Sequence, residues 1–245
     1  PQLLHSIPAR GVRAVCVSVR PRPDESSYMP VFLAGKMCAA AVAAALNVPL
    51  FTASHQEGHL RAALHGNEEL IGQPFLGMHI SGGTTEAFLV DQSLGISLLS
   101  GTEDLHAGQF VDRVGVAMGM HFPCGKQMEV LASEVHAKRS FPKLPAIVHG
   151  GMCSFSGVET QAQTLIKGGA DYAELAYAVY DCMARTFQKM LLYAMEKTGV
   201  TRALLAGGVA SSPLLRAMLR ERMEKRAKGV ALFFGESALS SDNAV

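Results

Sequence analysis

The chain has 245 residues, of which 49% are hydrophobic and 18% are charged. This length and composition exclude a disordered or fibrous chain and predict a globular protein with one large domain or two lobes. The formal net charge of +1 gives no general attraction to nucleic acid or to a membrane surface. No apolar run reaches the length of a membrane span, so we expect no membrane partner.

The cysteines and the chain ends carry two further expectations. The five cysteines stand singly and no C-x-x-C pair is present, which disfavours a disulfide framework or a thiolate zinc site and predicts a cytoplasmic protein. The first residues resemble the end of a helix, and Val245 resembles a helix start. We therefore expect further segments beyond both ends, including strands before the first residue.

In chain order, the first third of the sequence predicts a strand, a helix, a strand and a second helix. The β-branched run 14–19 and the short run 50–53 predict the strands, and the alanine-rich stretch 30–46 predicts the helix between them. The second helix begins at His55 and is expected to end near Leu64. This order is typical of α/β proteins.

The middle of the chain predicts three strands in succession, which form an antiparallel hairpin series. They cover residues 75–80, 86–90 and 96–99. The remainder predicts helices at 107–118, 126–139, 171–198 and 213–228, strands at 203–206 and 230–234, and loops at 140–151 and 235–243. The order of elements predicts an α/β fold with two lobes, residues 1–72 and residues 73–245.

Two histidines lie four residues apart in the segment His55-Gln-Glu-Gly-His59. In a helix both imidazoles project from one face, at a spacing that suits one shared cation. Such ligands favour iron or zinc, with a carboxylate as third ligand. Glu57 does not lie on that face and is therefore not the expected third ligand. An ordinary surface pair of histidines is the alternative.

Two double-glycine turns follow predicted strands. The segment Ser81-Gly-Gly-Thr84 follows the first strand of the hairpin series, and Gly207-Gly208 follows the strand 203–206. Adjacent glycines let backbone N–H groups approach an anion, and the hydroxyls of the first segment add donors. A helix start behind the second turn provides a further anion or nucleoside site. Plain tight turns are the alternative.

Three charged features each allow two interpretations. Asp242 lies in a polar loop after the last predicted strand, where its carboxylate could complete a metal site or cap a helix. Asp112 and Arg113, on one predicted helix, could contact a ribose or form a solvated pair. The basic stretch from Arg216 to Lys228 fits a solvated helix face better than an RNA contact.

Taken together, these segments resemble the tRNA threonylcarbamoyladenosine transferases, formerly described as O-sialoglycoprotein endopeptidases or glycoproteases, of the actin/Hsp70/sugar-kinase (ASKHA) superfamily. The resemblance covers nearly the whole chain in order. His55-Gln-Glu-Gly-His59 is similar to the family's H-x-E-G-H, Ile80-Ser-Gly-Gly-Thr-Thr85 to V-S-G-G-H-T, Ala107-Gly-Gln-Phe-Val-Asp-Arg113 to A-G-E-A-F-D-K, and Phe122-Pro-Cys-Gly125 to Y-P-G-G. Further on, Ser154-Phe-Ser-Gly157 is similar to F-S-F-S-G, Ala206-Gly-Gly-Val209 to A-G-G-V, and Ser241-Asp-Asn243 to T-D-N.

The resemblance implies a two-lobe ASKHA fold that transfers a threonylcarbamoyl group from threonylcarbamoyl-adenylate to the adenosine next to the anticodon of tRNA. It implies one divalent metal ion, iron or zinc, between the lobes, held by His55, His59 and Asp242. The residues implied to bind the adenylate are Ser81, Gly82, Gly83, Thr84, Asp112, Gly125, Gly207, Gly208 and Ser212. It also implies partner proteins of a tRNA-modification complex, or a homodimer. No catalytic side chain is assigned, because the transfer requires no protein nucleophile.

The sequence departs from the family pattern in the substrate site. Thr84 replaces a histidine or asparagine, Gln109 a glutamate and Cys124 a glycine, and Ser212 stands where the family has an asparagine. These changes leave the metal ligands in place. They make a divergent, non-catalytic paralogue that binds a nucleotide and scaffolds partners the first alternative. An ASKHA kinase or ATPase is the second, although the histidine pair would then have no role.

Overall fold

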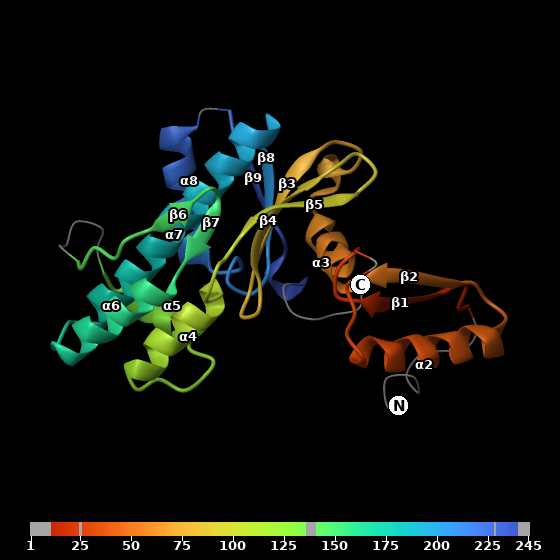
Figure 1. The fold of residues 1–245 in the computed structure, drawn as a ribbon, viewed down its shortest axis with the longest axis horizontal. Helices are drawn as coiled ribbons and strands as arrows, with labels where there is room; N and C mark the ends of the chain where they lie inside the picture. The colour runs from red at the N-terminus through yellow and green to blue at the C-terminus, as the bar shows by residue number, and fades with distance from the viewer. Residues whose placement is uncertain (1–10, 25, 136–140, 228, 240–245) are drawn as a thin grey trace. The chain divides into compact units, whose positions relative to one another are not determined.

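The computed structural model describes residues 11–24, 26–135, 141–227 and 229–239, and divides into two compact units (Figure 1). Of the described residues, those up to Arg61 form the first unit and those from Ala62 onward form the second. Among the described residues, no helix is both long enough and apolar enough to cross a lipid bilayer.

The first unit is a parallel strand pair joined by a helix. The strands β1 (Val15–Arg20) and β2 (Leu50–Ser54) pair in parallel. A parallel pair needs a crossover connection, and α2 (Val31–Leu46) supplies it and packs against β1. The helix ends at Asn47, whose φ of 52° lies in the left-handed region that terminates helices. Next, α3 (His55–Leu64) begins directly after β2 and continues into the second unit.

The second unit is built on a five-stranded mixed sheet. Its strand order is β5-β4-β3-β8-β9. The strands are β3 (Phe75–Ile80), β4 (Thr85–Val90), β5 (Ile96–Gly101), β8 (Arg202–Ala206) and β9 (Ala231–Phe234). The first three pair antiparallel, whereas β8 and β9 run parallel to β3. The carboxyl ends of β3, β8 and β9 therefore meet at one edge of the sheet, where open α/β sheets usually bind ligands.

Five helices complete the second unit. They are α4 (Ala107–Ala117), α5 (Gly125–Ser133), α6 (Ser156–Lys167), α7 (Tyr172–Thr198) and α8 (Pro213–Arg226). Figure 1 shows α4 to α7 grouped on one side of the sheet. The central helix α7 contacts α5, α6, α8 and the strands, and its Asp171 cap accepts a hydrogen bond from Glu174 N. Three fully buried rings, Phe110, Phe155 and Phe187, join α4, the start of α6 and α7 in one core.

Most predicted elements are confirmed to within a few residues, and three regions differ. A short hairpin of β6 (Ile147–His149) and β7 (Met152–Ser154) occupies a stretch expected to be mainly loop, because Gly150 and Gly151 adopt positive φ and turn the chain. Helix α6 was not predicted. Helix α5 ends at Ser133 instead of near Arg139, and residues 136–140 lie outside the described ranges. Short one-turn 3₁₀ helices, η1 (Glu68–Leu70) and η2 (Ser237–Leu239), lie in connecting segments.

Candidate functional site

The two double-glycine turns lie side by side at the carboxyl edge of the sheet. The last carbonyl of β3, Ile80 O, accepts a hydrogen bond from Val209 N in the turn after β8 (3.1 Å). Gly207 has a φ of +102°, and a Cβ at that position would lie 2.4 Å from Ile80 O. Only glycine therefore fits this contact, since any side chain would push the two turns apart.

The Ser81–Thr84 turn packs against the first residues of α4. Gly108 N donates to Ser81 O (3.2 Å), and Ala107 N donates to Thr85 Oγ1 (2.9 Å). A Cβ at Gly108 would lie 2.6 Å from the Cα of Gly82, so the helix start and the turn touch backbone to backbone. This contact places the positive end of the α4 dipole against the turn.

The turns present backbone donors to solvent. Gly82 and Gly208 are exposed, and within the described residues neither N–H has a hydrogen-bond acceptor. Gly83 N donates to Ser81 Oγ at 3.3 Å, a long contact. The edge of the sheet therefore combines unpaired N–H groups, hydroxyls and helix starts, which together suit a phosphate.

Asp112, Gly125 and Ser212 are connected through the start of α5. Asp112 Oδ1 accepts from Cys124 N (2.7 Å), which precedes Gly125. Ser212 caps α8 and donates its hydroxyl proton to Glu129 Oε1 (2.6 Å). These bonds tie α4, α5 and α8 together beside the glycine turns, so three of the predicted binding residues share one neighbourhood.

Glu129 is a member of this neighbourhood that the sequence did not reveal. The same Oε1 atom that contacts Ser212 also accepts from Leu214 N (2.9 Å), so the carboxylate sits at the start of α8. The only signal in the sequence is its position one helical turn after Gly125. Nearby, burial raises the pKa of Tyr180, with the Glu129 charge as a second cause, and the neutral hydroxyl donates to Gly125 O (3.0 Å).

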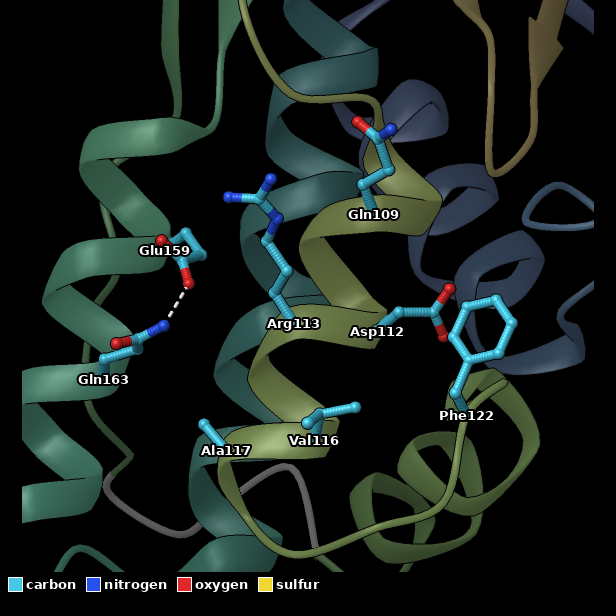
Figure 2. A pocket seen from close by; sticks show the side chains of 8 residues that line it. All are labelled: Gln109, Asp112, Arg113, Val116, Ala117, Phe122, Glu159 and Gln163. Atoms are coloured by element: carbon cyan, nitrogen blue, oxygen red, sulfur yellow. Dashed lines mark hydrogen bonds between the residues drawn. The ribbon is translucent and has the colours of Figure 1, made fainter.

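A pocket of about 570 Å³ opens beside Asp112 (Figure 2). Its lining residues are Gln109, Asp112, Arg113, Val116, Ala117, Phe122, Glu159 and Gln163. In Figure 2, Asp112 points toward the Phe122 ring, whereas Arg113 points toward α6. The alternative of a solvated Asp112–Arg113 pair is thus not what the structure shows, because the carboxylate contacts Cys124 N and no ion pair joins the two among the described residues.

The histidine pair lies on one face of α3, as its spacing predicted. The two Nε2 atoms are 3.0 Å apart, the ring centres are 4.4 Å apart, and both side chains are half-buried. Glu57 is not directed at the pair. Its Oε2 accepts from Ser54 N (2.5 Å) and caps the helix, which agrees with leaving it out of the metal site.

The third predicted metal ligand, Asp242, lies outside the described residues. Within the described ranges, no group of three or more His, Cys, Asp or Glu side chains could hold a metal ion. The two imidazoles themselves fit one cation. Their Nε2 atoms lie within hydrogen-bond distance of each other on one helix face, and a bound metal would replace the hydrogen bond that joins them.

The arrangement of the second unit, a mixed sheet with glycine turns at the carboxyl edge, defines an ASKHA-type fold. The chain is similar to the crystal structure of HypF from T. kodakarensis, with a TM-score of 0.65 and 16% identity over 91% of this chain and 37% of that one. It is also similar to full-length HypF in its phosphate- and nucleotide-bound form, with a TM-score of 0.64 and 11% identity over 82% of this chain and 35% of that one. At such identities these likenesses establish the fold alone.

The sequence comparisons identify the family. Residues 28–245 match the model of tRNA N6-adenosine threonylcarbamoyltransferase, TsaD. The chain is 32% identical over 219 residues to the enzyme of that name from Syntrophotalea carbinolica, and 33% identical over 211 residues to the one from Thermus thermophilus. Each match covers 86% of this chain and 62–63% of the relative. The chain therefore belongs to the tRNA N6-adenosine threonylcarbamoyltransferase family and spans somewhat less than two thirds of these relatives' length.

Proposed function

We propose that the protein transfers a threonylcarbamoyl group from threonylcarbamoyl-adenylate to the exocyclic amine of the adenosine next to the anticodon of tRNA. The observation that carries this proposal is the junction of the two glycine turns at Ile80 O, beside the start of α4, in a member of this family. The amine nitrogen forms a bond to the carbamoyl carbon. The bond from that carbon to the phosphate oxygen breaks, AMP leaves, and the amine loses a proton.

The phosphate end of the adenylate is assigned to the glycine turns. The unpaired N–H groups of Gly82 and Gly208 and the hydroxyls of Ser81 and Thr84 donate to its oxygens. Negative charge grows on this phosphate as AMP leaves. Donors already fixed by the contact of Gly108 with the turn stabilise that charge without rearranging.

The nucleoside end is assigned to the neighbourhood around α5. One carboxylate oxygen of Asp112 accepts a hydrogen bond from Cys124 N, and the second oxygen would accept one from a ribose hydroxyl. The Ser212 hydroxyl and the Glu129 carboxylate are further polar groups in this neighbourhood. Gly125 has no side chain, so a ligand can approach its backbone closely. The exposed Phe122 ring provides an apolar surface beside Asp112.

The metal is assigned to His55 and His59, with Asp242 as a third ligand. A bound iron or zinc ion would supply Lewis-acid polarisation of the carbamoyl group. The half-buried position of the two rings on one helix face holds their Nε2 atoms in place for such an ion. We place the reaction in the cytoplasm, with tRNA as acceptor and with a homodimer or partner proteins of a modification complex as the working assembly.

Complementation tests the proposal. The chain is expressed in a bacterial strain depleted of its own transferase, and the nucleosides of its tRNA are separated and weighed by mass spectrometry. We expect the wild-type chain to restore threonylcarbamoyladenosine, His55→Ala to abolish it, and His65→Ala to leave it intact. His65 is the matched control, because it lies just after the same helix and contacts Glu236 (3.2 Å). A wild-type chain that accumulates but restores no modified nucleoside would support the non-catalytic scaffold instead.

A further inference from the structure

Helix α8 carries more positive charge than the described structure neutralises. Its charged side chains are Arg216, Arg220, Glu221, Arg222, Glu224, Lys225 and Arg226. Arg222 pairs with Asp181 on α7, and Lys225 pairs with Glu221 (2.5 Å). Three arginines and one glutamate therefore have no ion-pair partner within the described residues. The uncompensated charge is concentrated in the first two turns of the helix, at Arg216 and Arg220.

These two guanidinium groups share one aromatic ring. The Cζ atom of Arg216 lies 5.0 Å from the centre of the Phe234 ring, and that of Arg220 lies 4.7 Å from it. Among the described residues, no carboxylate lies within ion-pair distance of either group. Two like charges are thus held close together by cation–π contacts, in an arrangement that an anion would relieve.

Arg216 is fixed in place and Arg220 is accessible. Arg216 Nε donates to Ala210 O (2.7 Å), and a terminal nitrogen donates to Gly235 O (2.7 Å). The Arg220 side chain is exposed and has no hydrogen-bond acceptor in the described part of the chain. The planar guanidinium on Phe234 therefore presents its N–H groups to solvent with little freedom to lose on binding.

The pair lies at the edge of the sheet that carries the candidate site. Ala210 belongs to the turn that begins at Gly207, and Gly235 follows β9 directly, so Arg216 bridges the carboxyl ends of β8 and β9. Helix α8 starts at this edge, and its Arg216 and Arg220 side chains reach the Phe234 ring at the end of β9. The arginine pair is thus anchored to the turn that begins at Gly207, to which we assign part of the adenylate.

We propose that Arg220, together with Arg216 on the Phe234 ring, binds backbone phosphates of the RNA whose adenosine accepts the threonylcarbamoyl group from the bound adenylate. This inference rests on the proposed function, because it names where the acceptor is held. Guanidinium groups match phosphate geometry through paired N–H donors, and an open surface suits a polymer backbone better than a small anion. The proposal revises the interpretation, made from the sequence, that the basic stretch beginning at Arg216 is a solvated helix face.

Salt-dependent binding of an unmodified tRNA transcript with adenosine next to the anticodon tests the inference. The full chain is titrated with labelled transcript at several salt concentrations. Arg220→Gln is expected to weaken binding roughly two- to fivefold near 0.1 M salt and to lower the slope of log K against log salt by about 1. Arg220→Lys keeps the charge but loses the paired N–H donors, so its affinity should lie between those of the wild type and Arg220→Gln. Glu224→Gln, which removes the carboxylate one turn away, tightens binding.

The matched control is Arg226→Gln, which removes the same charge at the far end of the same helix. It should change affinity less than Arg220→Gln. Equal losses in the two variants would show a general charge effect and overturn the inference, as would a slope unchanged in Arg220→Gln. A chain that binds no tRNA at any salt concentration would overturn it together with the proposed acceptor. A chain that binds tRNA regardless of Arg220 would leave the proposed transfer standing.

Discussion

Asp104 shows how a single carboxylate organises the entry to helix α6. It accepts from Ser154 Oγ (2.6 Å), Phe155 N (2.8 Å) and Ser156 Oγ (2.5 Å), and from its neighbour Leu105 N (2.6 Å). Partial burial would raise the pKa of Asp104. The hydrogen bonds from Ser154, Ser156 and the two backbone N–H groups outweigh that effect and hold the pKa well below its usual value.

Replacing Asp104 is expected to destabilise the second unit in a pH-dependent way. Asp104→Asn should lower the free energy of unfolding by about 1–2 kcal/mol at pH 7. This is less than the contribution of buried hydrogen bonds to a charged group, because the Asp104 side chain is exposed. The folded-state pKa is depressed, so the contribution is fully present above about pH 4 and is lost as pH falls toward the folded-state value. Urea unfolding at pH 7 and pH 3 measures both effects.

Glu103→Gln serves as the control for this experiment. Glu103 is the exposed neighbour of Asp104, and among the described residues its one hydrogen bond runs from its backbone N–H to Cys153 O (2.9 Å). Its replacement should change the unfolding free energy by less than about 0.5 kcal/mol. A loss of stability in Asp104→Asn that is the same at pH 3 as at pH 7 would contradict the role of the ionised carboxylate.

At the scale of elements, the junction of the two glycine turns can be tested by adding one carbon atom. Gly207→Ala places a methyl group 2.4 Å from Ile80 O at a positive φ, and should lower the free energy of unfolding by about 2–4 kcal/mol. Gly208→Ala adds the same methyl group at the next position, where nothing lies within 4 Å, and should cost less than about 0.5 kcal/mol. Chemical denaturation of both variants measures the difference. Equal effects would show that the turns are not packed as described.

Elements with a long or strongly alternating pattern could be predicted from the sequence. Helix α7 shows apolar residues at helical spacing over 27 positions, between the Asp171 cap and Gly199. The strands β3 and β4 carry a clear hairpin pattern. The three-residue strands β6 and β7 are too short to produce a periodic signal, and tertiary contacts with α7 and β5 stabilise them.

The candidate site was predictable in its parts and not in its assembly. Each glycine turn stands out by itself, and the histidine spacing predicts one helix face, which the structure confirms. The contact of Gly108 with Gly82 and the bond from Ser212 to Glu129 join residues far apart in the chain, through strand order and helix packing. No local pattern encodes such contacts, because they depend on how β3 and β8 become neighbours.

At the scale of the whole molecule, the functional residues divide between the two units. The histidine pair belongs to the first unit, whereas the glycine turns, Asp112, Gly125 and Ser212 belong to the second. All the residues to which we assign the adenylate therefore belong to the second unit. We therefore predict that adenylate binding depends on residues of the second unit and persists when the histidine pair is removed.

Calorimetric titration with a non-hydrolysable threonylcarbamoyl-adenylate analogue tests this central claim most directly. The wild-type chain and the His55→Ala variant should both bind the analogue. Asp112→Asn should weaken binding about tenfold or more, since hydrogen bonds to a charged group contribute about 1.5–3 kcal/mol. Glu103→Gln should match the wild type. An unchanged affinity in Asp112→Asn, or a wild-type chain that binds ATP but not the analogue, would contradict the account and favour a kinase or ATPase.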